Sequence, residues 1–281
     1  MVVVSGVDGF IGSALACRLR ALGVAVTGLG REVDLTQPEC TAGLSGVRAI
    51  IHLAAHSSVT ESYQNPHRYF QDNYLATLNL LELARLQKAR FILAGSYVYG
   101  NPQYLPVDER HPTAAFNPYA ASKLMSEALC SAYHQNFGVP VTILRIFNVF
   151  GPGQRGSLLL PTILSGLDAG RVSLGERTPR RDFVYVDDVT DAFVAALKWD
   201  GAAYEIFNIG SGRSISVEEV VENIRKFSGN AFEVHYEKPP RPTEIPDVRA
   251  DIRKAEEVLG WKARVDFETG IQKILDTRKC E

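Results

Sequence analysis

The first half of the chain alternates short apolar runs with longer stretches in which apolar residues recur at helical spacing. The apolar runs predict five strands, at 1–5, 24–29, 47–55, 89–95 and 139–151. The amphipathic stretches predict helices at 10–23, 69–87 and 118–138. Because the strands are almost continuously apolar, we expect helices to cover both faces of their sheet. The pattern therefore predicts an α/β fold with a Rossmann-like, doubly wound parallel sheet.

After residue 151 the expected elements become shorter. Strand patterns at 171–175, 204–210 and 232–238 alternate with helical patterns at 158–170, 216–229 and 267–276. We expect residues 1–150 to form a dinucleotide-binding domain, with part of the later chain returning to it. Residues 151–281 are expected to form mainly a smaller C-terminal α/β lobe. This lobe is expected to lie over the carboxyl ends of the strands, where ligands bind in such sheets.

The composition excludes several classes of protein without changing this picture. The 281 residues are 46% hydrophobic and 22% charged, which is ordinary for a globular protein, and the net charge of -2 provides no basic field for nucleic acid. The four cysteines are scattered without metal-binding spacing, so we expect no metal site and a reducing compartment. No leader or membrane-spanning run is evident, and we expect a cytoplasmic protein without a membrane partner.

A glycine-rich turn joins the first expected strand to the first expected helix. Its three glycines, Gly6, Gly9 and Gly12, have the spacing G-x-x-G-x-x-G. In dinucleotide-binding folds such a turn lets the backbone approach a pyrophosphate, and the helix N-terminus favours the anion. The alternative is a tight turn without a ligand. The position of the turn in the first βα unit favours a nicotinamide dinucleotide.

The end of the second expected strand bears on the choice between NAD and NADP. An acidic residue there would favour NAD, but Gly28 and Gly30 occupy the expected positions and Arg31 follows. A guanidinium pairs well with a 2′-phosphate, so Arg31 favours NADP weakly. The alternative is an exposed arginine neutralised by Glu32. Asp34 lies close enough along the chain to be a candidate for contact with the adenine amino group.

Tyr119 and Lys123 are four residues apart in the segment "NPYAASK", which begins an expected helix. Side chains at this spacing share one face of a helix, so the ammonium is expected near the phenol. A nearby positive charge lowers the pKa of a phenol, which would make Tyr119 an acid or base near neutral pH. The alternative is a tyrosine at the edge of the core and a solvent-exposed lysine.

Taken together, these segments resemble the extended short-chain dehydrogenase/reductases that act on sugar nucleotides, the NAD-dependent epimerase/dehydratase family. The resemblance also includes "IIHLAA", "QDNYLATLNLLELA", "RIFNVFGPGQ", "RRDFVYVDDV" and "RPTEIPDVRADIRKAEEVLGW", and it covers nearly the whole chain. It implies an enzyme with a Rossmann-like fold, NAD or NADP as cofactor, a nucleotide-diphosphate sugar as substrate and a homodimer. In the dimer the helices at 66–87 and 118–137 would pair across a two-fold axis.

The resemblance also implies roles for individual residues. Tyr119 would exchange a proton with the sugar hydroxyl, and Lys123 would support it and hold the nicotinamide ribose. Besides these two, the glycines, Arg31 and Asp34, the cofactor-binding positions would be Phe10, Ile11, Leu35, Leu53, Ala54, Ala55, Asn73 and Val149. The substrate-binding positions would be Ser96, Asn148, Leu160, Pro161, Arg181 and Arg241, with the two arginines on the diphosphate.

One position departs from the family pattern. Relatives carry a serine or threonine three residues before the valine of "VYG", and here that residue is Gly95, followed by Ser96. Adjacent strand residues point to opposite faces, so Ser96 can replace the missing hydroxyl only if the strand end bends or shifts. The loss of one such donor lowers rates by about 10² to 10³. An enzyme with Ser96 in this role and a catalytically impaired nucleotide-binding relative are both open.

The residues leave the reaction open between two further alternatives. Overall resemblance favours epimerisation at C4 through a transient ketosugar. Arg31 and the missing acid fit an NADPH-dependent reductase of 4-ketosugar nucleotides. Dehydration would need an acidic pair where this chain has Ser96 and Tyr97, so we do not expect a dehydratase.

Overall fold

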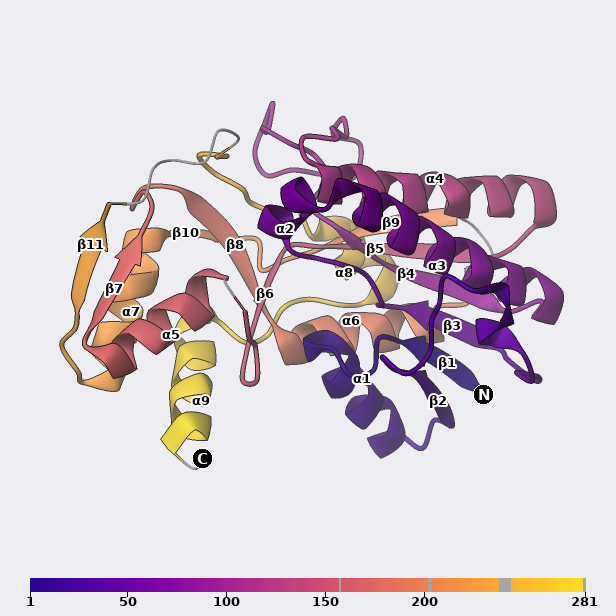
Figure 1. Ribbon diagram of the computed structural model, residues 1–281, viewed down its shortest axis with the longest axis horizontal. Helices are drawn as coiled ribbons and strands as arrows, with labels where there is room; N and C mark the ends of the chain where they lie inside the picture. Colours follow the sequence, from indigo (N-terminus) through magenta and orange to yellow (C-terminus); the bar gives the residue numbers. More distant parts are fainter. Residues whose placement is uncertain (157, 202–203, 238–243, 280–281) are drawn as a thin grey trace.

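A six-stranded parallel sheet forms the centre of the larger half of the protein in the computed structural model (Figure 1). The structure describes residues 1–156, 158–201, 204–237 and 244–279, so Arg241 and Cys280 lie outside the described residues. The spatial order of the strands is β2 (Val26–Leu29), β1 (Val2–Ser5), β3 (Ala49–His52), β4 (Arg90–Ser96), β5 (Val141–Ile146) and β9 (Tyr204–Ile209). Because β1 lies between β2 and β3, the topological switch point is at the carboxyl ends of β1 and β3.

Helices cover both faces of this sheet, as the apolar strands predict. Helices α1 (Phe10–Ala21) and α6 (Val186–Lys198) lie on one face, and α3 (Pro66–Gln87) and α4 (Pro118–Phe137) lie on the other (Figure 1). Alternate residues of β1 serve the two cores: Val2 and Val4 pack on the α1 side, and Val3 packs on the α3 side. The predicted doubly wound α/β fold is confirmed.

Two smaller sheets carry most of the second half of the chain. One contains β10 (Ser214–Ser216), β8 (Arg180–Tyr185) and β6 (Asn148–Phe150), and the other pairs β11 (Glu233–Tyr236) with β7 (Arg171–Leu174). Helices α5 (Leu159–Ala169), α7 (Val217–Ser228) and α9 (Phe267–Lys279) pack with them around a core of their own. The remaining short elements are η1 (Pro38–Thr41), α2 (Val59–Gln64) and α8 (Arg253–Leu259).

The single strand that we predicted at 139–151 is instead two strands in different sheets. β5 pairs with β4 and β9, whereas β6 pairs with β8. The break is at Phe147, which is buried in a separate cluster with Tyr99 and Val107. The chain therefore passes directly from the large sheet to the small one. β9 comes from the second half of the chain and pairs with β5 in the large sheet.

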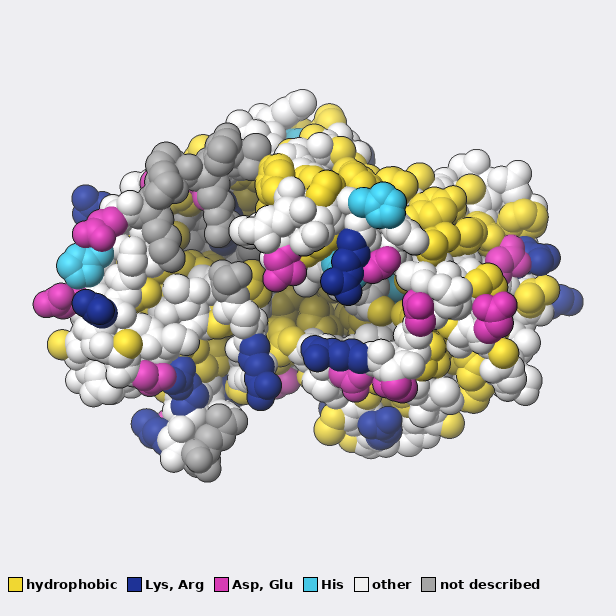
Figure 2. Space-filling view, in the orientation of Figure 1, with side chains coloured by type: hydrophobic (Ala, Val, Ile, Leu, Met, Phe, Trp, Pro, Cys, Tyr) yellow, Lys and Arg dark blue, Asp and Glu magenta, His cyan; other side chains and the backbone are white. Residues whose placement is uncertain are grey.

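The surface carries charges of both signs around a recess between the two halves (Figure 2). Hydrophobic side chains are visible in the recess, and lysine, arginine and acidic side chains lie along its rim. Within the described ranges, we find no helix with the combined length and apolar character that a membrane crossing requires.

Candidate active site

The glycine turn has the geometry that the sequence predicts. Gly6 follows β1 with a φ of 74°, and its N–H donates to the Leu29 carbonyl at 2.8 Å. A Cβ atom on Gly12 would overlap the Gly6 carbonyl, so only glycine lets α1 pack this closely on the turn. Helix α1 begins at Phe10, which places its free N-terminal amides beside the turn. Close backbone approach and unpaired amides are the features that a pyrophosphate requires.

The loop after β3 lies against this turn. A Cβ atom on Gly6 would lie 2.8 Å from the Ala54 nitrogen, so the two loops are in direct contact. The Ser5 hydroxyl accepts hydrogen bonds from the N–H groups of Leu53 and Ala54, each at 3.2 Å. Ala55 is exposed. The expected cofactor residues of both loops are therefore brought together at the switch point.

Asn73 of α3 fixes the same loop to helix α4. Its Oδ1 accepts from the His56 N–H at 2.8 Å, and its Nδ2 donates to the His56 carbonyl at 3.2 Å. The same amide donates to Ser122 Oγ at 2.9 Å. Asn73 is 2% exposed, so its amide links these segments in the interior of the protein. It connects the cofactor loop to the residue beside Lys123.

Tyr119 lies in the first turn of α4, at the carboxyl end of the large sheet. Asn117 caps this helix, because its side chain accepts from the Ala120 N–H at 2.7 Å. Ser96, the last residue of β4, lies close enough to Tyr119 for its hydroxyl to favour the phenolate. The structure thus brings together the phenol and the hydroxyl that the sequence proposed as partners.

The predicted effect of Lys123 on Tyr119 is wrong for this structure. Burial raises the pKa of Tyr119, and the nearby Ser96 hydroxyl only partly opposes that rise. The reason is that desolvation penalises the phenolate more strongly than its surroundings stabilise it. A phenol with a raised pKa is protonated at neutral pH.

Lys123 is itself strongly influenced by burial. It is 5% exposed, and burial lowers the pKa of its ammonium to about 8, with the Glu127 carboxylate opposing that fall. Within the described ranges its ammonium forms no hydrogen bond or ion pair, although His52 and Cys130 are near enough to interact with its charge. An ammonium without such a partner can still donate to a ligand.

Glu127, one helical turn after Lys123 on α4, forms a buried ion pair. Arg145 of β5 binds it through two hydrogen bonds, of 3.0 Å from Nε and 2.6 Å from Nη2. The guanidinium also lies over the Tyr99 ring, 4.9 Å from its centroid. Arg145 and Glu127 are 4% and 6% exposed. The pair is therefore part of the rigid base of the site.

Gly95 occupies a crowded position. A Cβ atom there would lie 3.0 Å from both Ile143 Cγ2 and the Leu144 carbonyl oxygen. A side chain at 95 would meet strand β5, so the neighbouring Ser96 is the residue that reaches Tyr119. The hydroxyl-bearing residue at this strand end is therefore Ser96, one residue later in the sequence than in the family pattern.

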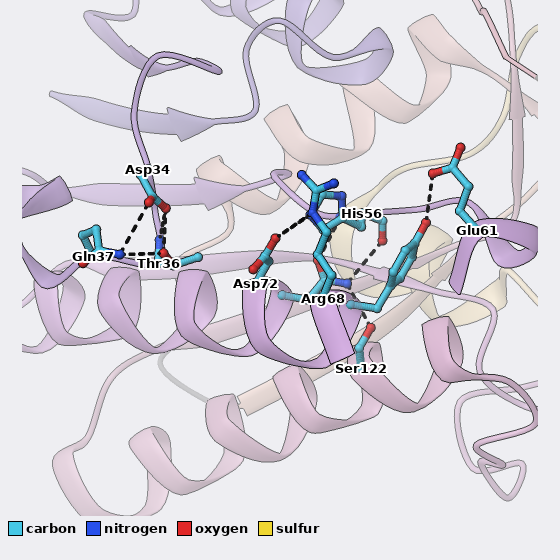
Figure 3. A network of polar contacts seen from close by, with 10 residues as sticks. Asp34, Thr36, Gln37, His56, Glu61, Arg68, Asp72 and Ser122 are labelled. Atoms are coloured by element: carbon cyan, nitrogen blue, oxygen red, sulfur yellow. Dashed lines mark hydrogen bonds and ion pairs between the residues drawn. The ribbon is translucent and has the colours of Figure 1, made fainter. Parts of the chain in front are cut away.

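At the end of β2, Arg31 and Asp34 are both exposed. The Asp34 carboxylate accepts from the Thr36 N–H at 3.0 Å and the Thr36 hydroxyl at 2.7 Å (Figure 3). Its proposed contact with adenine stays a prediction. Leu35 is buried in the core below α3, which leaves its backbone for any contact with a cofactor.

The expected substrate residues are spread over the start of the second half. Asn148 and Val149 lie on β6, and the Asn148 amide donates to the Asp182 carbonyl at 3.3 Å. Arg181 on β8 donates to the Ile245 carbonyl at 2.6 Å and pairs with Glu244. Leu160 is buried in the core of the smaller sheets, so its side chain does not present a surface to a nucleobase, whereas Pro161 is partly exposed.

Sequence reasoning missed several polar residues that organise the site. Ser5, His52 and Thr77 form a buried chain of hydrogen bonds from β1 through β3 to α3. Their only signal in the sequence is the presence of polar residues inside apolar runs. Such residues need partners when buried, but the sequence does not say which.

Comparison with known proteins agrees with this geometry. Residues 2–210 match the profile of the NAD dependent epimerase/dehydratase family. The chain is 34% identical to UDP-glucose 4-epimerase of Mycolicibacterium smegmatis, over 98% of this chain and 97% of that protein. It is 31% identical to GDP-6-deoxy-D-mannose reductase of Pseudomonas aeruginosa, over 97% and 95% of the two chains.

Solved structures give the same result. The complex of Thermus thermophilus UDP-glucose 4-epimerase with NAD superposes with a TM-score of 0.89 at 30% identity, covering 99% of this chain and 98% of that chain. Similar structures hold NAD or NADPH, so a nicotinamide dinucleotide is the cofactor of these proteins. This chain is an enzyme of the NAD-dependent epimerase/dehydratase family.

Proposed function

We propose that the protein epimerises a nucleotide-diphosphate sugar at C4 through a transient ketosugar, with Tyr119 as acid and base. The observation that carries this proposal is the grouping of Ser96, Tyr119 and Lys123 at the carboxyl end of the sheet. The similarity to UDP-glucose 4-epimerases over nearly the whole chain supports the reaction.

The residues present fit a nicotinamide dinucleotide. The backbone of Gly6, Gly9 and Gly12 and the first amides of α1 would hold the pyrophosphate, because no side chain blocks that approach. Lys123 would donate to the nicotinamide ribose. Phe10, Ile11, Leu53, Ala54, Ala55, Asn73 and Val149 complete the proposed cofactor site. When bound, the nicotinamide ring accepts and returns a hydride.

Tyr119 would accept and return the proton of the reacting hydroxyl. As the C4–H bond breaks, Tyr119 Oη takes the hydroxyl proton, and it gives the proton back when the opposite face of the ketone is reduced. Ser96 would donate a hydrogen bond to the same sugar oxygen. Because burial raises the pKa of Tyr119, the positive charge of the oxidised nicotinamide would have to offset desolvation for the phenol to act as a base.

The diphosphate of the substrate would bind in the second half of the chain. We assign Arg181, Arg241 and Asn148 to it, since guanidinium groups pair well with phosphate oxygens. Leu160 and Pro161 remain the proposed residues near the nucleobase, Leu160 through its backbone. On this proposal residues 1–150 hold the dinucleotide and residues 151–281 mainly hold the nucleotide sugar.

A net reductase is the second candidate. The similarity to GDP-6-deoxy-D-mannose reductase and the exposed Arg31 favour NADPH-dependent reduction of a 4-ketosugar nucleotide. A binding protein without turnover is the third candidate, motivated by Gly95. The proximity of the Ser96 hydroxyl to Tyr119 supports an active site over this third candidate.

Turnover of UDP-glucose tests the first candidate, and NADPH-dependent turnover of a 4-ketosugar nucleotide tests the second. An epimerase would form the C4 epimer without net consumption of added NADH or NADPH, as followed by chromatography and absorbance at 340 nm. Tyr119→Phe should abolish product formation. Arg181→Ala should raise KM, whereas Arg180→Ala, whose guanidinium pairs with Glu219 at 2.7 Å, serves as the matched control. Nucleotide binding with no Tyr119-dependent turnover would contradict the proposal.

We also propose a homodimer formed through α3 and α4. Both helices expose large hydrophobic side chains: Leu86 is 66% exposed, Phe137 56% and Met125 38%. Light scattering should give twice the mass of the chain, and Phe137→Glu should reduce it to the mass of one chain. The free thiols of Cys17, Cys40 and Cys130 support the proposal of a cytoplasmic protein.

A further inference from the structure

The end of β2 contains negative charge that the sequence does not show there. In dinucleotide-binding folds an acid at this position accepts hydrogen bonds from the adenine ribose. Here the position is Gly30, the first residue after β2. A Cβ atom built on Gly30 would overlap Asp8 Oδ2 and Glu32 Oε2. The two carboxylates thus occupy the space that an acidic side chain at residue 30 would use.

Backbone hydrogen bonds hold both carboxylates at this place. Asp8 Oδ2 accepts from the Arg31 N–H at 2.7 Å, and Glu32 Oε1 accepts from the Gly30 N–H at 3.1 Å. Asp8 comes from the glycine turn, which the parallel pairing of Ser5 with Leu29 places beside the end of β2. Both residues are exposed, so oxygen lone pairs remain for a ligand.

The charges here favour a ribose with free hydroxyls. A 2′-phosphate would add about -1.5 to -2 charges beside two carboxylates. The single guanidinium of Arg31 balances only one of these carboxylates. Within the described part of the chain, its side chain forms no hydrogen bond or ion pair that fixes it toward a phosphate. Ribose hydroxyls, by contrast, can donate to carboxylate oxygens.

We propose that Asp8 and Glu32 together select NAD(H) over NADP(H). This inference rests on the proposed function, because it assumes that the dinucleotide lies along the glycine turn. It reverses the weak preference for NADP that Arg31 alone indicates. A cofactor without the 2′-phosphate also fits internal hydride return better than net reduction, so the inference favours the epimerase.

Calorimetric titration with NAD⁺ and NADP⁺ tests the selection directly, on protein freed of any dinucleotide that co-purifies. The wild-type protein should bind NAD⁺ about tenfold more tightly or better, since two like charges face the phosphate. The isosteric double variant Asp8→Asn/Glu32→Gln should reduce this preference about tenfold, mainly through tighter binding of NADP⁺. Adding Arg31→Ala to the double variant should weaken the binding of NADP⁺ again.

Glu39→Gln is the matched control, because it removes one exposed carboxylate from η1, which follows this loop, without touching Gly30. It should leave the ratio of the two dissociation constants unchanged. Equal or tighter binding of NADP⁺ by the wild type would overturn the inference, as would an unchanged ratio in the double variant. If neither dinucleotide binds, the proposed function fails as well, whereas a preference for NADP⁺ leaves the proposed function intact.

Discussion

Ser5 Oγ and His52 Nδ1 lie 2.8 Å apart in the interior below the two cofactor loops. The Ser5 hydroxyl accepts from two backbone N–H groups, so its own proton goes to His52 Nδ1. Burial lowers the pKa of His52 to about 3, with the charge of Lys123 adding to the effect, so the ring is neutral. Its remaining proton is on Nε2 and is donated to Thr77 Oγ1 at 3.2 Å.

This ordering predicts a selective effect of His52 variants. His52→Leu leaves the Ser5 hydroxyl and Thr77 without their partner, and should lower the free energy of unfolding by about 1–3 kcal/mol. The cofactor loop should loosen, so the dissociation constant for the dinucleotide should rise more than KM for the sugar nucleotide. His52→Asn retains an acceptor for Ser5 and should be the milder variant. Equal losses in both variants would contradict the ordered chain.

Ser96 and Gly95 give a second prediction, measured as kcat. Ser96→Ala should reduce kcat by about 10² to 10³, because the sugar oxygen loses one donor. Gly95→Ser/Ser96→Ala should not recover activity. A side chain at 95 meets Ile143 and the Leu144 carbonyl, and should instead destabilise the protein by about 1–3 kcal/mol. Recovery of kcat in the double variant would show that residue 95 faces the substrate.

The lowered pKa of Lys123 predicts how the free energy of unfolding depends on pH. Its pKa in the folded protein is about 8, below the usual value of 10.5, because burial disfavours the charge. Between these pH values the unfolded chain binds more protons, so stability should increase as pH rises from 8 toward 10. The expected gain is on the order of 2 kcal/mol. Tyrosines with raised pKa values and the buried Cys130 thiol oppose this gain, because in the unfolded chain they lose protons at about pH 9 to 10, so the contribution of Lys123 is read from the comparison with a Lys123 variant.

Urea unfolding at pH 7.5 and 9.5 measures this effect. The variant Lys123→Met removes the titrating group and should lose the gain, while remaining folded because the methionine fills the same buried space. Lys198→Met, on the exposed end of α6, is the control and should behave like the wild type. A gain of the same size in Lys123→Met would assign the pH dependence to other groups.

The sheet was predictable because its strands are buried on both faces, and the glycine turn because Gly6 needs a positive φ. The same holds for Tyr119 and Lys123, whose spacing on a helix sets their relative position. By contrast, the break at Phe147 depends on a hydrophobic cluster assembled from residues such as Tyr99 and Val248. No local pattern contains that information.

Charges near the site were less predictable, because they depend on contacts between distant segments. Asp8 and Glu32 meet only because β1 and β2 pair in one register. The pKa values of Tyr119 and Lys123 depend on burial, which spacing along the chain does not define. Sequence therefore proposed the candidate reacting groups, and the structure defines their electrostatic surroundings.

The buried pair of Glu127 and Arg145 gives the last prediction. Glu127→Gln leaves the Arg145 guanidinium without a counter-charge in the interior and should reduce the free energy of unfolding by about 3–5 kcal/mol. The double variant Glu127→Leu/Arg145→Met removes both charges, so its free energy of unfolding should fall much less. In the double variant the pKa of Lys123 should fall further, because the carboxylate that opposes its fall is gone.

Chemical denaturation of the three proteins measures the stabilities, and the pH dependence of kcat reports the ammonium. We expect activity in the double variant to decline at a lower pH than in the wild type, since the neutral amine forms earlier. Arg18→Met/Asp191→Leu is the matched control, because that pair, 2.9 Å apart, is partly exposed and should contribute about 0–1 kcal/mol. If the double variant keeps the wild-type pH profile, Glu127 only packs the base of the site and does not influence Lys123.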